Sequence, residues 1–365
     1  MRRTISTLLA LAISIVLVGC GATQPVAKPN AQENATEQNA TQATTAQLAS
    51  WREGSASLKA LTDYVEAATT EGGAGYVPVE ERIAVFDLDG TLMCETYPWC
   101  FEYMVFADYA LNNPSYEAPA EVAEVAQEIL DSAWGEKPSG MSTRQASAAA
   151  IAYAGLTPEE LEAYVTEFKS SKAEGFEGMT RGEAWYKPMV EVVEYLQAHD
   201  FDVYVVTATE RNIVRAIVAG ALDVDPSHVI GTEYGYCATG QGDKDAGDYE
   251  FQPGDQIVFD GSYEGENAKT SKVDAIVREI GRQPVLAFGN SSGDESMLTY
   301  VLANNANPSA SFMVLDDDAE REYGDVGGAA EQRAKWEEAG YTVFSMHDDF
   351  ATIYGEGVQK APVVK

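Results

Sequence analysis

Residues 82–91 read Arg82-Ile83-Ala84-Val85-Phe86-Asp87-Leu88-Asp89-Gly90-Thr91, and the expected architecture follows from them. The apolar first half is typical of a buried strand, and a turn follows it. Side chains two positions apart on a strand point the same way, so Asp87 and Asp89 face one small site. Two carboxylates aimed together are costly unless a cation or a reaction requires them.

Apolar strand-like runs recur along the chain, and helical patterns separate most of them. The runs are Ile83–Phe86, Val203–Val206, Val285–Phe288, Phe312–Leu315 and Thr342–Phe344. The helical patterns include Met189–His199, Glu210–Ala221, Ser271–Ile280 and Glu295–Leu302. This alternation predicts an α/β fold with a parallel sheet flanked by helices. Such sheets bind ligands at the carboxyl ends of their strands, which is where Asp87 and Asp89 lie.

A long segment, residues 95–186, separates the first two strands and is mainly helical in pattern. Ala118–Trp134 repeats apolar residues at helical spacing. Thr157-Pro158-Glu159-Glu160 is typical of a helix start, with Thr as the N-cap and Pro in the first turn. We therefore expect a core formed by residues 51–94 and 187–365, into which a helical domain is inserted.

The first residues, 1–19, have the pattern of a targeting segment. Two arginines precede Leu8–Val18, an apolar run that is too short to span a bilayer comfortably. Leu17-Val18-Gly19-Cys20 ends the run and resembles a bacterial lipobox, in which the signal is cut before the Cys and the thiol is lipidated. An ordinary secretory signal cut nearby is the alternative. We expect a lipid anchor on Cys20 and an extracytoplasmic location at a bacterial cell envelope.

Residues 20–50 are rich in Ala, Thr, Gln and Asn and predict a flexible tether. The chain carries 58 acidic and 24 basic residues, a formal net charge of −34, which argues against nucleic acid as a partner. An anionic substrate is compatible with this charge, because a local lysine and a metal ion reverse the field inside a pocket.

The histidines and cysteines argue against a zinc site and limit the number of disulfides. The three histidines are scattered and show no zinc-ligand spacing. Once Cys20 is lipidated, Cys94, Cys100 and Cys237 remain, and an odd number allows at most one internal disulfide.

Three further segments carry polar residues at a predicted strand end or helix start. They contribute Thr207, then Lys269 and Lys272, and then Asn290 and Asp294. Together with the paired aspartates, and in this order, they resemble the four motifs of the haloacid dehalogenase (HAD) superfamily, most of whose members are phosphatases. The inserted helical segment resembles the cap domain of many HAD phosphatases.

The motif lysine depends on which relatives are compared. Ser271-Lys272, with Ile280-Gly281-Arg282-Gln283-Pro284 closing the helix, resembles a subset of exported HAD phosphatases. That subset includes lipoproteins and phosphorylcholine phosphatase-like enzymes, and it typically has Asn at the position of Asn290, where most of the superfamily has Asp. Asn267-Ala268-Lys269 instead resembles phosphoserine phosphatases. We take Lys272 as the motif lysine and keep Lys269 as the alternative.

The resemblance implies a Mg²⁺-dependent hydrolase of small phosphomonoesters that works through an aspartyl phosphate. Asp87 is the implied nucleophile, and Asp89 is the implied general acid and base, which requires its pKa to be raised relative to that of Asp87. Thr207 and Lys272 are the implied phosphate clamp. The implied Mg²⁺ ligands are Asp87, Asp89 through its backbone carbonyl, Asn290 and Asp294.

Substrate choice is expected to lie in the cap, which begins with the aromatic-rich segment 97–106. Aromatic rings beside an acid suit a quaternary ammonium group such as that of phosphorylcholine. The helical spacing of Trp99, Tyr103 and Phe106 instead favours packing of the cap against the core. The predicted substrate contacts are Thr91, Tyr97, Trp99, Tyr103 and Ala208. Rival functions are a phosphotransferase on the same scaffold and a non-catalytic binding lipoprotein in which Asn290 marks lost metal binding.

Overall fold

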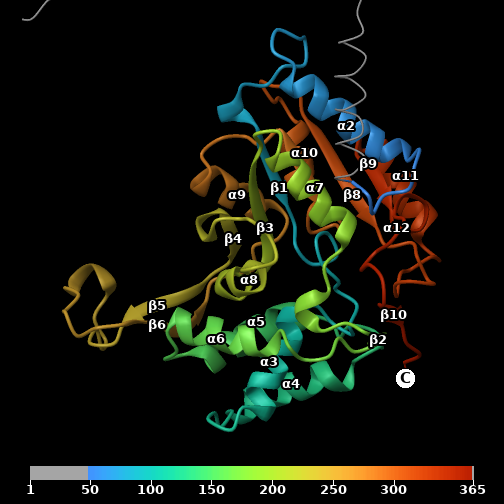
Figure 1. Ribbon diagram of the computed structural model, residues 1–365. Coiled ribbons are helices and arrows are strands. Elements are labelled where there is room, and N and C mark those ends of the chain that lie inside the picture. The colour runs from blue at the N-terminus through green and yellow to red at the C-terminus, as the bar shows by residue number, and fades with distance from the viewer. Residues whose placement is uncertain (1–47, 364–365) are drawn as a thin grey trace, which may run out of the picture. The chain divides into compact units, whose positions relative to one another are not determined.

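A six-stranded sheet forms the centre of the computed structural model, which describes residues 48–363 (Figure 1). Neighbouring strands run parallel throughout. Their order is β4 (Val229–Thr232), β3 (Asp202–Glu210), β1 (Ile83–Phe86), β7 (Leu286–Gly289), β8 (Ala310–Leu315) and β9 (Thr342–Ser345). The predicted α/β class is confirmed, the five predicted strands are present, and β4 is an additional edge strand.

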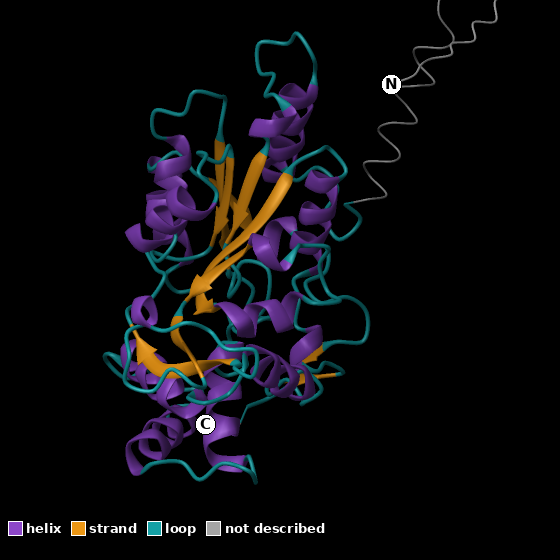
Figure 2. Ribbon diagram, turned by 90° about the vertical axis from the view of Figure 1, so that its left-hand side faces the viewer, coloured by secondary structure: helices purple, strands orange, loops and turns teal. Residues whose placement is uncertain are grey.

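Helices cover both faces of the sheet, because successive strand residues point to opposite sides. Figure 2 shows helices on both sides of the strands. Phe86 belongs to the hydrophobic cluster shared with α2 (Ala56–Thr69) and α7 (Lys187–Gln197). Val85 belongs to the cluster on the opposite face, which is shared with α9 (Thr270–Glu279), α10 (Glu295–Leu302) and α11 (Ala329–Glu338). β1 and β7 are buried along their whole length, as central strands of a parallel sheet should be.

The strand register brings several chain segments to one edge of the sheet. Phe86, the last residue of β1, lies beside Val205 of β3 and Phe288 of β7. The residues that follow in each segment therefore leave the sheet together at its carboxyl edge. Asp87 is held there by its backbone N–H, which donates to the carbonyl of Phe288 at 2.9 Å.

The segment between β1 and α7, which we call the cap, forms α3 (Phe101–Asn112), α4 (Ala120–Asp131), α5 (Met141–Tyr153) and α6 (Pro158–Phe168). The predicted helix start is confirmed at α6. Thr157 Oγ1 accepts from the N–H of Glu160 at 3.2 Å, and Glu160 Oε2 accepts from the N–H of Thr157 at 2.9 Å. This reciprocal cap satisfies two backbone donors at the end of the helix.

Two linkers join the cap to the core, and they lie side by side. Met93 and Trp185 form an antiparallel bridge. The N–H of Cys94 donates to the carbonyl of Ala184 at 2.8 Å. A short two-stranded sheet adds a third connection, in which β10 (Gln359–Lys360), near the C-terminus, pairs with β2 (Phe176–Glu177) of the cap.

A hairpin of β5 (Tyr234–Ala238) and β6 (Ile257–Tyr263) leaves the core between β4 and α9. It lies against the cap helices in Figure 1. Phe259 joins it to the turn after α5, because its carbonyl accepts from Gly155 at 2.8 Å and its N–H donates to Leu156 at 2.9 Å. Residues 187–365 were predicted to belong to the core, but the β5–β6 hairpin within this range packs on the cap helices.

The remaining helices are short. They are α8 (Arg211–Val218), α12 (Met346–Asp349) and the 3₁₀ turns Val79–Glu81, Arg181–Glu183, Pro226–His228 and Ala246–Asp248.

The predicted signal segment, Cys20 and most of the predicted tether lie outside the described residues. Leu48 and Ser50 are buried, so the folded part begins before the predicted tether end at residue 50. Within residues 48–363, no helix is long and apolar enough to cross a membrane. The thiols of Cys94, Cys100 and Cys237 are free in this part of the chain.

Candidate active site

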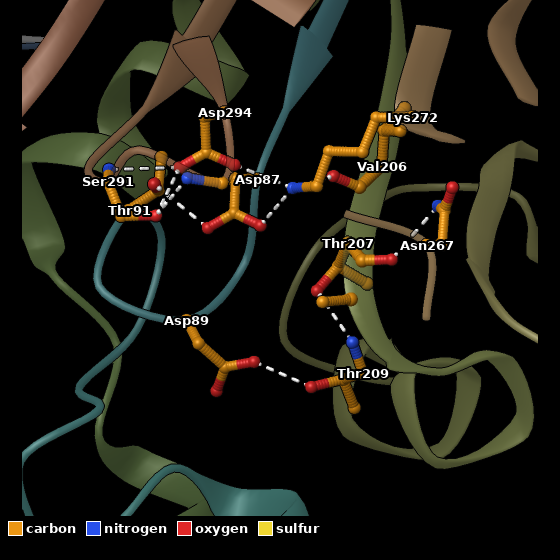
Figure 3. A network of polar contacts seen from close by, with 12 residues as sticks. Asp87, Asp89, Thr91, Val206, Thr207, Thr209, Asn267, Lys272, Ser291 and Asp294 are labelled. Carbon is orange, nitrogen blue, oxygen red and sulfur yellow. Dashed lines mark hydrogen bonds and ion pairs between the residues drawn. The ribbon is translucent and has the colours of Figure 1, made fainter. Parts of the chain in front are cut away.

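Asp87 stands at the end of β1 with both carboxylate oxygens engaged. Oδ1 accepts from Lys272 Nζ at 2.6 Å, and Oδ2 accepts from Thr91 Oγ1 at 3.2 Å (Figure 3). Burial, with the charge of Asp294, raises the pKa of Asp87 to about 7, and Lys272 opposes the rise. Thr91 was predicted to contact substrate, but it is fully buried and supports Asp87 instead.

Lys272 is the lysine that reaches the carboxylates. Its ammonium donates to Asp87 at 2.6 Å, to Asp294 Oδ1 at 2.7 Å and to the carbonyl of Val206 at 2.8 Å. Burial opposes the charge on Lys272, but the two carboxylates outweigh burial and raise its pKa. Lys269 precedes α9 without a capping hydrogen bond from its side chain. It is exposed and lines the cavity over the site, but it has no ion pair with these carboxylates.

Asp294 ties the loop after β7 to this lysine. Its Oδ2 accepts from the backbone N–H groups of Asn290 at 3.1 Å and Ser291 at 3.0 Å. Only 2 % of Asp294 is exposed, so its two oxygens are shared between the loop and Lys272. The Asn290 side chain contacts the first cap linker instead of Lys272, because its Nδ2 donates to Glu95 Oε1 at 2.7 Å.

Asp89 lies two residues past Asp87 and contacts a different strand. Its Oδ2 accepts from Thr209 Oγ1 at 2.7 Å (Figure 3). Its Oδ1 is buried and has no hydrogen-bond partner among residues 48–363. Burial raises the pKa of Asp89, and the Thr209 hydrogen bond opposes this. A raised pKa was expected for Asp89 relative to Asp87, but burial raises both carboxyls.

Thr207 and Thr209 come from the end of β3. Thr207 is buried, its Oγ1 accepts from the N–H of Thr209 at 3.2 Å, and its carbonyl accepts from Asn267 Nδ2 at 3.0 Å. Thr209 was missed from the sequence. The available signal was its spacing of two from Thr207, which puts both side chains on one side of a strand that continues to Glu210.

Glu95 is the second residue that the sequence reasoning missed. It lies in the first cap linker, where Asn290 donates to it. Burial raises the pKa of Glu95 to about 8, and the nearby charges of Asp89 and Asp87 add to the rise. The only sequence signal was an acid four residues past the motif that ends at Thr91.

A cavity of about 300 Å³ opens over these residues. Tyr103 and Ala208, two of the predicted substrate contacts, line it. Other cap side chains on its wall are Cys100, Glu102, Lys137, Ser142, Gln145 and Ala146.

Tyr97 and Trp99 do not line this cavity, which corrects their prediction as substrate contacts. Tyr97 is fully buried, its ring lies 4.9 Å from the Arg181 guanidinium and its carbonyl accepts from Arg181 at 2.8 Å. Trp99 donates from Nε1 to the carbonyl of Ile129 at 3.0 Å. Both rings pack within the cap, where large aromatic side chains contribute much of the buried apolar area. The hydroxyl of Tyr97 has no hydrogen-bond partner among the described residues.

The carboxylates and the one ammonium near them fit a divalent cation. Four acids, Asp87, Asp89, Glu95 and Asp294, line the cavity. Among residues 48–363, Lys272 is the cation that forms ion pairs with them, and it pairs with Asp87 and Asp294. Carboxylate and amide oxygens of this kind are the ligands that Mg²⁺ accepts. In residues 48–363 no group of three His, Cys, Asp or Glu side chains forms a metal site by itself. Mg²⁺ accepts a mixed set of oxygens and keeps several waters, so Asp87, Asn290, Asp294 and the carbonyl of Asp89 would suffice to hold it.

Several solved structures resemble this chain at low identity. A protein of unknown function from Bordetella pertussis Tohama I is 20% identical, covers 72% of this chain and 98% of its own, and has a TM-score of 0.45. A functionally unknown protein from Anaerococcus prevotii DSM 20548 is 15% identical, with coverages of 79% and 91% and a TM-score of 0.48. Cytosolic 5'-nucleotidase IIIB bound to cytidine is 13% identical, with coverages of 81% and 86% and a TM-score of 0.46. Likeness this distant carries no argument about substrate.

Sequence comparison gives the family. No curated protein matches the chain significantly. Residues 84–299, more than half of the chain, match the family model described as haloacid dehalogenase-like hydrolase. The matched range begins within β1 and ends in α10, so it contains every residue of the site described above. This chain belongs to the haloacid dehalogenase-like hydrolase family.

Proposed function

We propose that the protein is a Mg²⁺-dependent phosphomonoester hydrolase that works through an aspartyl phosphate. The observation that carries the proposal is the Asp87 carboxylate, fixed by Lys272 and Thr91 at the carboxyl edge of the sheet and lining a cavity. Membership of a hydrolase family supports it. A carboxylate that a lysine ammonium fixes in a polar cavity is suited to nucleophilic attack on phosphorus. A protein that only binds a phosphorylated ligand has less need of it.

The first half of the reaction transfers the phosphoryl group to the protein. An oxygen of Asp87 attacks phosphorus, and the bond from phosphorus to the leaving oxygen breaks. Asp89, whose pKa is raised by burial, gives its proton to that oxygen, so the product alcohol departs neutral. Thr209 holds Asp89 through Oδ2, which leaves the unpartnered Oδ1 to carry the proton.

The second half releases phosphate. Asp89, now a carboxylate, takes a proton from water, and the water oxygen attacks phosphorus. The bond from phosphorus to Asp87 breaks, inorganic phosphate leaves, and both aspartates return to their starting states. The net reaction consumes one ester and one water and yields one alcohol and one phosphate.

Electrostatic support comes from Lys272 and Thr207. Lys272 holds Asp87 at 2.6 Å, and Thr207 lines the cavity from the end of β3. Fixed donors of this kind stabilise the charge that develops on the transferring phosphoryl oxygens. When bound, Mg²⁺ would supply further charge neutralisation at those oxygens.

A small phosphorylated metabolite is the proposed substrate, since the cavity measures about 300 Å³. Lys137 lies 4.6 Å from the ring centre of Tyr103 and 5.7 Å from that of Trp99. The chain's own cation thus covers the rings that a quaternary ammonium would use. This favours an uncharged or anionic leaving group over phosphorylcholine, the substrate type of the resembling subset.

The proposed setting is the bacterial cell envelope. Its support is the lipobox-like Leu17-Val18-Gly19-Cys20, with Cys20 carrying the lipid, and the strongly acidic composition that disfavours nucleic acid. Metabolic labelling with a palmitate analogue tests the anchor, and Cys20→Ala should abolish the label.

The test of the activity is hydrolysis of p-nitrophenyl phosphate by the full-length protein in mild detergent, with Mg²⁺ and with EDTA. Turnover should require Mg²⁺ and fall by several orders of magnitude in Asp87→Asn. Equal turnover in EDTA, or activity retained in Asp87→Asn, would contradict the mechanism. Product transfer to an added alcohol in place of free phosphate would identify a phosphotransferase. Ligand binding without turnover of any phosphomonoester would identify the binding protein.

A further inference from the structure

The first cap linker brings an acid to the loop after β7. Glu95 Oε1 accepts from Asn290 Nδ2 at 2.7 Å, across 195 positions of sequence. Asn290 follows β7 and is one of the predicted ligands of the divalent cation. A hydrogen bond between a ligand and a residue beyond it orients the ligand and tunes its charge.

The pair lies directly on the turn that follows Asp89. Gly90 has a φ of 77°, a backbone conformation that favours glycine. A Cβ at Gly90 would overlap both Asn290 Nδ2 and Glu95 Oε1. The carboxylate of Glu95 therefore sits against the same short turn that carries the backbone carbonyl of Asp89.

The other groups of the site leave it short of negative charge for a divalent ion. Asp87 and Asp294 are two carboxylates, and the ammonium of Lys272 contacts both and cancels one of them. Asp89 carries the proton at the start of the proposed reaction, and Asn290 is neutral. Cation affinity in carboxylate sites rises with the number of charged ligands.

We infer that Glu95 belongs to the divalent-cation site and, as a carboxylate when the cation is bound, supplies the negative charge that Asn290 lacks. A cation beside a carboxyl group favours its ionised form. The inference rests on the cation in the proposed function. Glu95 also orients Asn290, because an amide whose nitrogen faces Glu95 turns its oxygen to the opposite side, where it is available as a ligand.

The test is Mg²⁺ binding to the substrate-free, full-length protein, measured by isothermal titration calorimetry. Glu95→Gln keeps an acceptor oxygen for Asn290 but removes the charge, and affinity should fall by about 10- to 100-fold. Glu264→Gln is the matched control, because it removes one acidic charge from an exposed residue that does not line the cavity. Its affinity should equal that of the wild type.

The decisive variant carries Glu95→Gln together with Asn290→Asp. It returns a carboxylate to the site from the other partner, so Mg²⁺ affinity should recover to within a few-fold of wild type. A residue that only stabilises the fold would not be rescued in this way. Thermal melting of each variant shows that the affinities refer to folded protein.

The outcomes separate this inference from the proposed activity. Wild-type Mg²⁺ affinity in Glu95→Gln would overturn the inference while leaving Mg²⁺-dependent turnover in place. An unchanged affinity with a raised KM would also overturn it and would assign Glu95 to the substrate. Absence of Mg²⁺ binding by the wild type would overturn both this inference and the cation requirement of the proposed function.

Discussion

Lys272 keeps two buried carboxylates from repelling each other. Only 1 % of it is exposed, and it bridges Asp87 and Asp294 at 2.6 and 2.7 Å. Removing one member of a buried ion network leaves its partners without compensation. We expect Lys272→Met to lower the free energy of unfolding by about 3–5 kcal/mol and kcat by about 10²–10³-fold. Urea unfolding and p-nitrophenyl phosphate turnover measure the two effects.

Lys269→Met is the matched control, since Lys269 is exposed and makes no ion pair with the site. Its free energy of unfolding should stay within about 0.5 kcal/mol of wild type. The opposite pattern, with Lys269→Met inactive and Lys272→Met active, would show that the other motif register is correct.

Several site residues could be predicted because each stands at a strand end or a helix start. Parallel strands bring those ends to one edge, so Asp87, Lys272 and Asp294 meet without any knowledge of the loops. Thr209 and Glu95 could not be found this way. Their positions depend on how far β3 continues and on how the cap linker folds back over Gly90.

At the scale of one element, Glu210 is the buried N-cap residue of α8, and burial disfavours the ionised form of its carboxyl group. Its Oε2 accepts from the N–H of Ile213 at 2.9 Å at the start of α8, and burial raises its pKa to about 7. The folded protein therefore holds a proton on Glu210 that the unfolded chain releases above its ordinary pKa of 4.5. This contribution to stability is complete below pH 4.5 and is lost as the pH rises to 7.

We expect Glu210→Gln to flatten that part of the pH dependence. The difference in unfolding free energy between variant and wild type should change by about 3 kcal/mol between pH 4.5 and pH 8, in favour of the variant at the higher pH. Urea unfolding at several pH values measures it. A difference that is constant with pH would show that Glu210 titrates normally.

Asp225→Asn should behave in the opposite sense and serves as the control. Asp225 caps the 3₁₀ turn Pro226–His228 from an exposed position, and hydrogen bonds from Ser227 lower its pKa. Its stabilisation is therefore complete above its ordinary pKa of 3.8 and is lost below that value, as the pH falls through the lowered pKa of the folded protein.

The predicted helices and strands are buried in a regular way, so their apolar residues recur at the spacing of a helix or a strand. Flanking helices such as α7 are buried on one side only, and their apolar residues recur accordingly. α3 is buried on nearly all sides and therefore carries no clear stripe. β4, β5 and β6 were missed because each is a short run interrupted by a glycine, Gly231, Gly235 and Gly261 respectively.

At the scale of the whole molecule, the C-terminal strand fastens the cap to the core. β10 pairs with β2, and the N–H of Ala361 donates to the carbonyl of Gly175 at 2.8 Å. Lys360 Nζ donates to the carbonyls of Ala319 at 2.9 Å and Glu322 at 2.7 Å, which are core residues. The last strand therefore contacts both parts of the protein.

We expect a chain ending at Gly357 to loosen the cap without unfolding the sheet. Hydrogen exchange should quicken at residues 175–177, while β1 and β7 keep their protection, because few buried apolar contacts are removed. A chain ending at Ala361 keeps β10 and is the control. A general rise in exchange across the sheet would show instead that the strand is needed for global stability.

The fold class could be inferred from the sequence because alternating strands and helices leave few possible topologies. The family came from the resemblance of four ordered motifs, not from this alternation. The contact between the β5–β6 hairpin and α5 could not, since it joins distant segments through backbone groups such as Gly155 and Phe259. Hydrogen bonds between backbone groups do not depend on which side chains the residues carry, so the pattern of residue types does not predict them.

The side-by-side linkers have a consequence for how such a protein changes over evolutionary time. Met93 and Trp185 are bridged neighbours, so the chain departs from β1 and returns toward β3 at nearly the same point. A segment whose two ends meet can be lengthened, shortened or exchanged without pulling the flanking strands apart. Recombination at this junction would exchange the cap residues that line the cavity, Glu95 among them, while Asp87, Lys272 and Asp294 stay with the core.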